Sequence, residues 1–366
     1  MEKLNEIISR FPEVGAVDSV RPLGSGLIND TYVVRTASAD APDYVMQRIN
    51  HAIFKDVDLL QKNIEAVTSL IRDRLEAEGD TDIDRHVLRF IKADTGKTYF
   101  FDGESYWRLM VYIPRSVSYE TVDAHYAELA GREFGRFEAR LTSLADQLGE
   151  TIPDFHNMTL RLRQLEEAVE ADPAGRVAEV MPIVEDIRRR AYDMTFADRL
   201  YAAGLLPKRV CHCDTKVNNM LFDAGNESFL CVIDLDTVMP GYVFSDVGDF
   251  MRTAGNTMPE DSPEYDRIDF RADIFEAFMR GYLSTATEFL TAVEIEHLPD
   301  AAAMFPYMQA VRFLTDYING DHYYKVSYPG HNLVRTRNQM RLLECVEARL
   351  ADMRDAVAGI LKARNQ

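Results

Sequence analysis

Two short segments of the sequence contain the acidic and amide side chains that phosphate chemistry requires. They are residues 210–219 (VCHCDTKVNN) and residues 231–236 (CVIDLD). An Asp that can accept a proton, an Asn five residues later and an Asp beyond a hairpin form the layout of a phosphoryl-transfer site. Asp214 would orient the acceptor hydroxyl and take its proton, while Asn219 and Asp234 would hold Mg2+ against the nucleotide phosphates.

A short β-hairpin is predicted between the two segments. Residues 220–223 and 229–233 have the apolar character of strands, and Gly225 lies in the turn between them. The hairpin would return Asp234 to the metal from the side opposite to Asn219. Each part is weak evidence alone, because His and Asp are common in loops and strands often end in Asp.

The next segment, residues 239–250 (MPGYVFSDVGDF), adds a third acidic pattern. With it the chain resembles the aminoglycoside phosphotransferase/choline kinase-like superfamily, whose motifs are H-x-D-x(4)-N, then I-D, then D-x-(G/A)-D. The sequences of its three motifs, HCDTKVNN, CVIDLD and SDVGD, are most similar to those of the N-acetylhexosamine 1-kinases of that superfamily. The resemblance implies an ATP- and Mg2+-dependent kinase of small-molecule hydroxyl groups, with Asp214 as the catalytic base.

The resemblance also implies an α+β, two-lobed, protein-kinase-like fold. Residues 1–114 would form a nucleotide-binding N-lobe, made of a five-stranded antiparallel sheet plus a helix. Residues 115–366 would form a mainly helical C-lobe that contains the catalytic β-hairpin and the metal and acceptor sites. The length agrees with this, because 366 residues are many for one domain and suit two lobes.

The periodicity of apolar residues places the elements of this fold. Strand-like alternation occurs at residues 17–23, 32–35, 44–50, 87–92, 98–101 and 106–113. Apolar residues recur with a helical period at residues 2–10, 56–77, 122–144, 181–203, 264–287, 299–319 and 335–363. The sheet and its helix therefore come first, and the helical part follows.

The turn Gly24-Ser25-Gly26 between the first two strands is the predicted nucleotide loop. Two glycines let the backbone approach a polyphosphate closely and direct its N–H groups inward. A hairpin turn without a ligand can have the same sequence, but the position ahead of the later motifs favours the nucleotide loop. The resemblance places the hinge between the lobes at residues 110–114, where the backbone of Tyr112 would meet adenine.

The strand at residues 44–50 departs from the family pattern, because it holds no Lys for the α- and β-phosphates. Arg48 is the available cation, and Gln47 stands where a Lys is expected. Side chains alternate along a strand, so only one of the two faces the cleft, and Arg48 is favoured. On the following helix Glu65 is the candidate partner of that cation, with an exposed surface Glu as the alternative.

Further polar residues near the base are predicted to support it. The resemblance implies that His212 braces the catalytic loop, and Asp246 is expected to anchor it through backbone N–H groups. Asp249 is interpreted as an acid at a helix start that interacts with the helix dipole. Lys216 could reach the transferring phosphoryl group or face solvent. Asp236 could be an additional metal ligand, although a contact with the backbone is favoured.

The acceptor site is predicted in residues 311–324 (VRFLTDYINGDHYY). Arg, Asp and aromatic side chains at a helix C-terminus suit a sugar, since rings stack on its face and polar groups bind its hydroxyls. The resemblance to N-acetylhexosamine 1-kinases places Arg312 and Tyr323 at acceptor-contacting positions. A core helix with a surface Arg is the alternative.

The composition and net charge of the chain argue against some classes of binding partner. A net charge of −19 argues against nucleic acid and anionic membranes, because both are bound by an excess of Lys and Arg. The sequence shows no signal-peptide pattern and no apolar run of bilayer length, so a cytoplasmic location is expected. Cys211 and Cys213 would share one face of a strand with His212 on the other, which argues against a zinc site.

The predicted reaction is phosphorylation of the anomeric hydroxyl of N-acetylglucosamine or N-acetylgalactosamine, which gives the sugar 1-phosphate. ATP would be the donor and Mg2+ the cofactor, and the protein would be a monomer or a weak homodimer. The alternatives are a kinase of choline, homoserine or an aminoglycoside on the same fold, a nucleotide-binding module without catalysis, and a helical scaffold.

Overall fold

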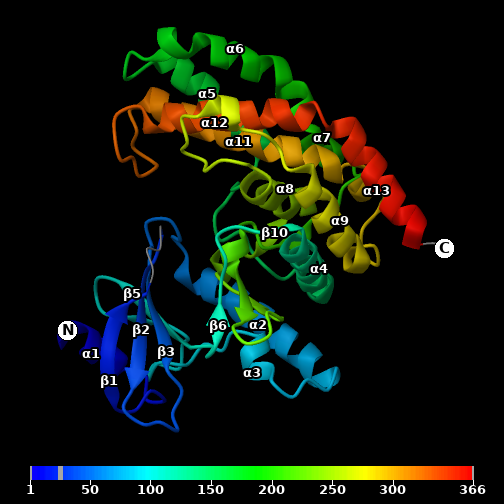
Figure 1. Cartoon of the computed structure of the whole chain (residues 1–366). Helices are drawn as coiled ribbons and strands as arrows, with labels where there is room; N and C mark the ends of the chain where they lie inside the picture. The colour runs from blue at the N-terminus through cyan, green and yellow to red at the C-terminus, as the bar shows by residue number, and fades with distance from the viewer. Residues whose placement is uncertain (1, 24–27, 365–366) are drawn as a thin grey trace. The chain divides into compact units, whose positions relative to one another are not determined.

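The computed structural model describes residues 2–23 and 28–364, and the chain divides into two compact units (Figure 1). The first unit consists of Met1–Ser118, Asp146–Pro153 and Met220–Met239. The second consists of Tyr119–Ala145, Asp154–Asn219 and Pro240–Gln366. The first unit holds a five-stranded antiparallel sheet, and the second is almost wholly helical. The predicted α+β, protein-kinase-like fold class is therefore confirmed.

The five-stranded sheet of the first unit has the strand order β1-β2-β3-β5-β4. In chain order its strands are β1 (Val17–Pro22), β2 (Asp30–Thr36), β3 (Tyr44–Ile49), β4 (Phe100–Phe101) and β5 (Tyr106–Val111). Each neighbouring pair is antiparallel. Helix α1 (Glu2–Ile8) buries Ile7 and Ile8 in one cluster with Val34, Met46 and Leu109 of the sheet. Alternate strand residues thus supply the core beneath α1.

The predicted strand at residues 87–92 is wrong. This segment follows the short helix α3 (Ile83–His86) and joins the sheet only through a single bridge between Phe90 and Met110. Val87 and Leu88 are both buried, so the two-residue alternation of a strand is broken at its start. The sheet therefore has five strands although six segments show strand-like alternation.

Helix α2 (Val57–Ala77) matches the helix predicted at residues 56–77. Asp56 caps its N-terminus, because the Asp56 side chain accepts a hydrogen bond from the N–H of Leu59. One face of α2 is buried, and within it the amide of Asn63 donates to the carbonyls of Gly149 and Val238. These two hydrogen bonds join two later segments of the chain to the first unit.

The hairpin predicted beside the catalytic residues belongs to the first unit and not to the helical part in which it was predicted. Strands β8 (Met220–Asp223) and β9 (Phe229–Val232) form the hairpin, and β6 (Ser116–Val117) pairs with β8 to complete a three-stranded sheet. Arg85 of α3 forms an ion pair of 2.7 Å with Asp223 at the end of β8. These contacts connect the hairpin to the first unit. The first segment of that unit ends at Ser118, four residues beyond the predicted boundary at residue 114.

The second unit is built around helix α11 (Leu298–Asn319), which is apolar and buried along most of its length. The other helices are α4 (Ala124–Leu141), α5 (Met158–Ala171), α6 (Val177–Met194), α7 (Phe196–Ala202), α8 (Val243–Ala254), α9 (Ala272–Ala286), α10 (Ala292–Glu296), α12 (His331–Glu347) and α13 (Leu350–Arg364). The strand β7 (Arg209–Cys211) leads into the catalytic loop, and β10 (Met239–Gly241) precedes α8. Each of the helices predicted at residues 181–203 and 335–363 is two helices in the structure, α6 with α7 and α12 with α13. The sequence did not show these breaks, because the apolar period continues across them.

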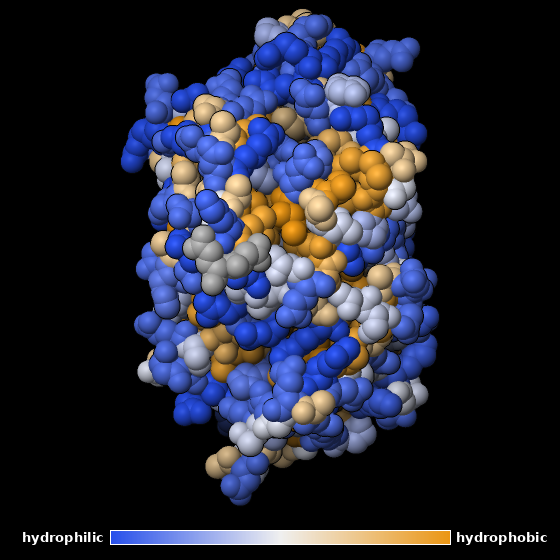
Figure 2. Space-filling model, turned by 90° about the vertical axis from the view of Figure 1, so that its right-hand side faces the viewer, coloured by the Kyte–Doolittle hydropathy of each residue, from blue (hydrophilic) through white to orange (hydrophobic). Residues whose placement is uncertain are grey.

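Most residues on the face shown in Figure 2 are hydrophilic. Among the described residues, no helix is both long and apolar enough to cross a membrane.

Helices α4 and α9 pack with their backbones in close contact through glycines. A Cβ atom added to Gly131 would overlap the carbonyl oxygen of Phe278, and one added to Gly281 would overlap that of Glu128. We expect Gly281→Ala to lower the free energy of unfolding by about 1–3 kcal/mol, the usual cost of overpacking. Gly359→Ala in α13 is the matched control, because an added Cβ meets no atom there. Urea denaturation of both variants measures the difference, and equal midpoints would contradict the close packing.

Candidate functional site

The loop at residues 212–219, which follows β7, is the predicted catalytic loop, and it places the predicted base beside a cation and an amide. Asp214 follows β7, and its Oδ1 lies 2.7 Å from Nζ of Lys216. The side-chain amide of Asn219 donates to Oδ2 of Asp214 at 3.0 Å and to the Asp214 carbonyl at 2.8 Å. The loop is thus closed on itself, and Asp214, Lys216 and Asn219 form one cluster in the second unit.

The charges of this cluster stabilise one another. Burial raises the pKa of Asp214, but the neighbouring Lys216 ammonium and the Asn219 hydrogen bond outweigh it, so that the pKa lies below its ordinary value. Burial lowers the pKa of Lys216, but the carboxylates of Asp214 and Asp249 raise it above its ordinary value. Asp214 is therefore ionised at neutral pH and can accept a hydrogen bond from a hydroxyl.

Asp246 of α8 fixes the backbone of the loop through hydrogen bonds. Its two carboxylate oxygens accept hydrogen bonds from the N–H groups of His212 and Cys213, each at 2.7 Å, and its carbonyl accepts one from Thr215. Cys213 has a φ of 62°, a left-handed conformation that is uncommon for a residue other than glycine. Two charge-assisted hydrogen bonds hold the backbone in this conformation, as the predicted anchoring role of Asp246 requires.

His212 is buried, and its ring lies 6.0 Å from the rings of both Phe134 and Phe137 on α4. This placement in the second unit suits the predicted bracing role. Asp249 differs from its prediction. It lies in the middle of α8, which begins six residues earlier at Val243, and its carboxylate pairs with Arg252 at 3.0 Å. It is a buried ion-pair partner and not an acid at a helix start.

A buried acid that the sequence did not single out completes the support of the loop. Glu138 of α4 accepts a hydrogen bond from Tyr282 on α9 and is hydrogen-bonded to Asp246. Burial, followed by the charge of Asp246, raises the pKa of Glu138 well above 4.5. Among the described residues its Oε1 has no hydrogen-bond partner. The signal in the sequence was a Glu on the apolar stripe of α4, beside Phe137.

The raised pKa of Glu138 predicts a pH dependence of stability. Between pH 4.5 and the raised pKa the folded protein holds a proton that the unfolded chain releases, so this contribution is complete below pH 4.5 and is lost as the pH rises. We expect Glu138→Gln, which keeps a hydrogen-bond donor, to gain stability relative to the wild type with increasing pH, by at most about 1.4 kcal/mol per pH unit. Urea denaturation from pH 5 to 8 measures it, with the exposed Glu288→Gln as control; parallel curves for Glu138→Gln and the wild type would contradict it.

In the first unit, the segment after β9 contains two aspartates, Asp234 and Asp236, which differ in solvent exposure. Asp234 has φ 58° and ψ 57°, a left-handed conformation, and is exposed, whereas Asp236 is buried. The exposed carboxylate of Asp234 is a hard oxygen ligand. Asn219 in the second unit gives its amide nitrogen to Asp214, which leaves its oxygen as the atom for a cation. Both donor atoms therefore fit the predicted Mg2+.

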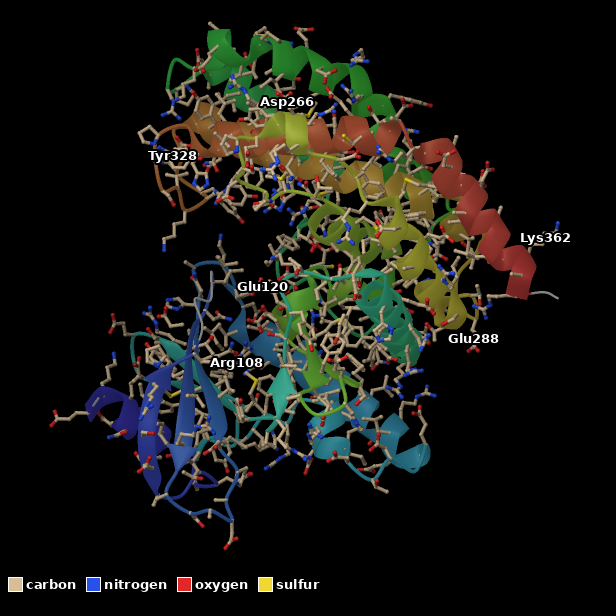
Figure 3. The ribbon with its side chains drawn as sticks, viewed as in Figure 1. Arg108, Glu120, Asp266, Glu288, Tyr328 and Lys362 are labelled. Atoms are coloured by element: carbon tan, nitrogen blue, oxygen red, sulfur yellow. The ribbon has the colours of Figure 1, made fainter. Side chains whose placement is uncertain are left out.

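Asp236 takes part in a buried network of side chains. Its carboxylate accepts hydrogen bonds from Arg108 at 2.5 Å and from Asn29 at 2.7 Å. Arg108 lies on β5 directly across from Gln47 of β3, and its guanidinium also donates to the Gln47 side chain at 2.6 and 2.9 Å. The carboxylate of Asp236 thus contacts side chains, and not the backbone as had been expected. Arg108 is labelled in Figure 3, in the first unit.

The predicted nucleotide residues have the following places in the first unit. Arg48 is exposed and pairs with Asp30. Glu65 accepts a hydrogen bond from Thr98 at 2.7 Å. Tyr112 donates its backbone N–H to the carbonyl of Asp43 at 2.8 Å. The loop residues Gly24, Ser25 and Gly26 lie outside the described residues. Among the described residues of this sheet the buried cation is Arg108, which the sequence did not distinguish because it stands within the apolar run YWRLMV.

The two predicted acceptor residues line one pocket of the second unit. The pocket has a volume of about 420 Å3 and is lined by Arg161, Gln164, Glu167, Ala168, Arg312, Thr315, Asp316, Asn319, Tyr323 and Tyr324. The guanidinium of Arg312 lies over the rings of Tyr323 and Tyr324, at 5.9 and 5.6 Å from their centroids. Asp316 fixes the turn that carries both rings, because its carboxylate accepts hydrogen bonds from their backbone N–H groups.

The four cysteines are free and buried. Among the described residues, no three His, Cys, Asp or Glu side chains are grouped as a metal site.

Comparison with known proteins gives a consistent result. A family model described as "Phosphotransferase enzyme family" matches residues 19–288. An aminoglycoside phosphotransferase from Alicyclobacillus acidocaldarius is similar in structure, with a TM-score of 0.62 and 14% identity over 97% of this chain and 96% of that one. A choline kinase from Cryptosporidium parvum gives 0.58 and 12% over 100% and 98%, and a spectinomycin phosphotransferase in complex with ADP gives 0.57 and 13% over 94% and 98%.

Proposed function

Because the chain belongs to the phosphotransferase enzyme family, we propose that it is an ATP- and Mg2+-dependent kinase of N-acetylglucosamine or N-acetylgalactosamine. The product would be the sugar 1-phosphate. The observation that carries the proposed transfer is the cluster of Asp214, Lys216 and Asn219, in which an ionised carboxylate is held beside an ammonium group. Phosphoryl transfer depends mainly on positioning and charge, and this cluster supplies both.

Each residue of the cluster has a defined part in the proposed reaction. Asp214 accepts the hydrogen bond of the acceptor hydroxyl, aligns its oxygen and takes its proton as the bond to phosphorus forms. Asn219 and Asp234 would hold Mg2+, which neutralises charge on the nucleotide phosphates when it is bound. Lys216 keeps Asp214 ionised through their ion pair. Asp246 keeps the loop backbone in place through the N–H groups of His212 and Cys213.

The charges around the pocket favour a sugar over a cationic acceptor. Arg161 and Arg312 both line it, and the buried acid on its wall, Asp316, is already used by four hydrogen bonds from the N–H groups of residues 322–324 and from Asn332. A quaternary ammonium or a polyamine would meet two guanidinium groups there, and like charges repel. A sugar could stack on Tyr323, which is 64% exposed, and bind the guanidinium groups through its hydroxyls and carbonyl.

The test is ADP release with Mg-ATP against N-acetylglucosamine, N-acetylgalactosamine, glucose, galactose, choline, homoserine and kanamycin, with phosphorus NMR of any product. We expect turnover with the two N-acetylhexosamines and a phosphate on C1. Turnover with choline or kanamycin alone would overturn the acceptor assignment and keep the phosphotransferase. ATP binding without turnover of any acceptor would favour a nucleotide-binding module.

A further inference from the structure

Two guanidinium groups line the pocket formed by α5 and α11, and neither is paired with a carboxylate among residues 2–23 and 28–364. Arg161 donates to the carbonyls of Asp154 and Phe155 and to the side-chain oxygen of Gln164. Arg312 donates to the side-chain oxygen of Gln309 and otherwise lies over aromatic rings. All these hydrogen-bond partners are neutral, so two positive charges share one pocket without an ion-pair partner among the described residues.

This arrangement is unusual for the chain, whose acidic residues outnumber its basic ones by 60 to 41. Arg252, by comparison, pairs with both Asp249 and Glu260. Nε of Arg161 is buried and meets no hydrogen-bond acceptor. Burial, followed by the charge of Arg312, lowers the pKa of Arg161. Two partly dehydrated guanidinium groups that repel each other cost stability, and an anion between them would remove that cost.

The acids on the pocket wall do not supply that anion. Asp316 is committed to four donors of the turn after α11. Glu167 is exposed, and its carboxylate lies 3.7 Å from Nε of Arg163, a third cation. The pocket also offers the hydroxyl of Tyr324, which is buried and has no hydrogen-bond partner. Burial raises the pKa of Tyr324, so its hydroxyl stays protonated and can donate.

We propose that this pocket binds an oxyanion, a carboxylate or a phosphate monoester, carried by the acceptor at a position other than the hydroxyl that is phosphorylated. The guanidinium forks of Arg161 and Arg312 match the planar edge of such a group, and the Tyr324 hydroxyl adds a third donor. Contacts within the second unit connect the pocket to α8, which holds the catalytic loop through Asp246. Arg312 lies over the ring of Phe155, Phe155 stacks on His156, and His156 contacts Phe305, which packs against Gly248 of α8. The inference rests on the proposed function and adds to its acceptors N-acetylhexosamines that carry an acidic or phosphorylated substituent.

The experiment is titration calorimetry of the full chain without nucleotide, so that any anion bound comes from the acceptor. N-acetylglucosamine is compared with its 6-phosphate, glucose with glucuronate, and inorganic phosphate is titrated alone. The anionic member of each pair should bind about 10–100-fold more tightly, as one or two charge-assisted hydrogen bonds provide. Glucuronate and the 6-phosphate distinguish a carboxylate from a phosphate.

Matched variants connect the effect to the pocket. Arg161→Gln should abolish the preference for the anionic member, so that both members of a pair bind with similar affinity, whereas Arg163→Gln, exposed two residues away on α5, should leave the preference and both affinities unchanged. If Arg161→Gln does not fold, Arg312→Lys keeps the charge but loses the planar fork, and should reduce the preference about tenfold.

The outcomes separate the inference from the proposed function. Equal affinity within each pair overturns the inference, and turnover of the neutral N-acetylhexosamines would then still support the function. Tighter binding of anionic sugars without ADP release from any sugar would keep the pocket assignment and overturn the function. Binding of inorganic phosphate with no gain for the phosphorylated sugar would contradict an anion carried by the acceptor.

Discussion

Asp214→Asn should lower kcat for ADP release by about 10²–10⁴-fold, the contribution of a positioned acid–base group. The variant removes the charge that aligns the acceptor hydroxyl but keeps an oxygen for the Asn219 amide, which now donates to Oδ2 at 3.0 Å. The affinity for ATP should change much less, because no nucleotide contact is assigned to Asp214. Steady-state kinetics measure kcat, and thermal shifts with Mg-ATP measure binding.

The control for this variant is Asp266→Asn, an exposed carboxylate of the same unit (Figure 3). It should leave kcat unchanged. A kcat of Asp214→Asn within tenfold of the wild type would mean that Asp214 is not the base. The pKa of Asp214 lies below its ordinary value, so this group should also keep the reaction rate flat from neutral pH down to mildly acidic pH and reduce it only in stronger acid.

Arg108→Met should lower the free energy of unfolding by about 3–5 kcal/mol, because it leaves the buried carboxylate of Asp236 without its cation. The double variant Arg108→Met/Asp236→Leu should recover most of this loss, since an apolar pair of similar volume replaces a buried ion pair at little cost. Arg48→Met is the matched control on β3. Its partner Asp30 is exposed, and such pairs contribute about 0–1 kcal/mol.

Nucleotide affinity of the same variants tests the phosphate-binding prediction. Loss of ATP binding in Arg48→Met with unchanged stability would support Arg48 as the phosphate cation. In the stable double variant, a normal ATP affinity together with a lower kcat would indicate that Arg108 acts by fixing the segment between Asp234 and Asp236. A double variant as unstable as Arg108→Met would contradict the ion-pair explanation, and urea denaturation decides this.

The sequence was informative where function depends on residues close together in the chain. Asp214 and Asn219 meet because they lie five residues apart on one loop. The helix at 56–77 was predictable because its period is regular and Asp56 is a standard N-cap. The superfamily resemblance added the connection from this loop to Asp246, which lies 34 residues beyond His212.

The sequence was uninformative where a charged residue is buried against a distant partner. Arg108 and Asp236 are 128 residues apart, and Tyr282 and Glu138 are 144 residues apart. A charged residue is ordinarily expected at the surface, so Arg108 could not be distinguished from a solvent-exposed side chain, and Glu138 was marked only by its place on the apolar stripe of α4. Only the tertiary structure supplies the partner that makes such burial tolerable.

The glycine contact between α4 and α9 also has a consequence for biosynthesis. Helix α4 ends at Leu141 and α9 begins at Ala272, and the whole catalytic loop is encoded between them. Chains are synthesised at about 5–20 residues per second, so α9 becomes available to pack on α4 on the order of 10 s after α4 has been made. During this interval the face of α4 that contains Gly131 and Gly135 is open to chaperones or to other nascent chains. The rigid support that later carries the catalytic loop is thus completed late on the ribosome.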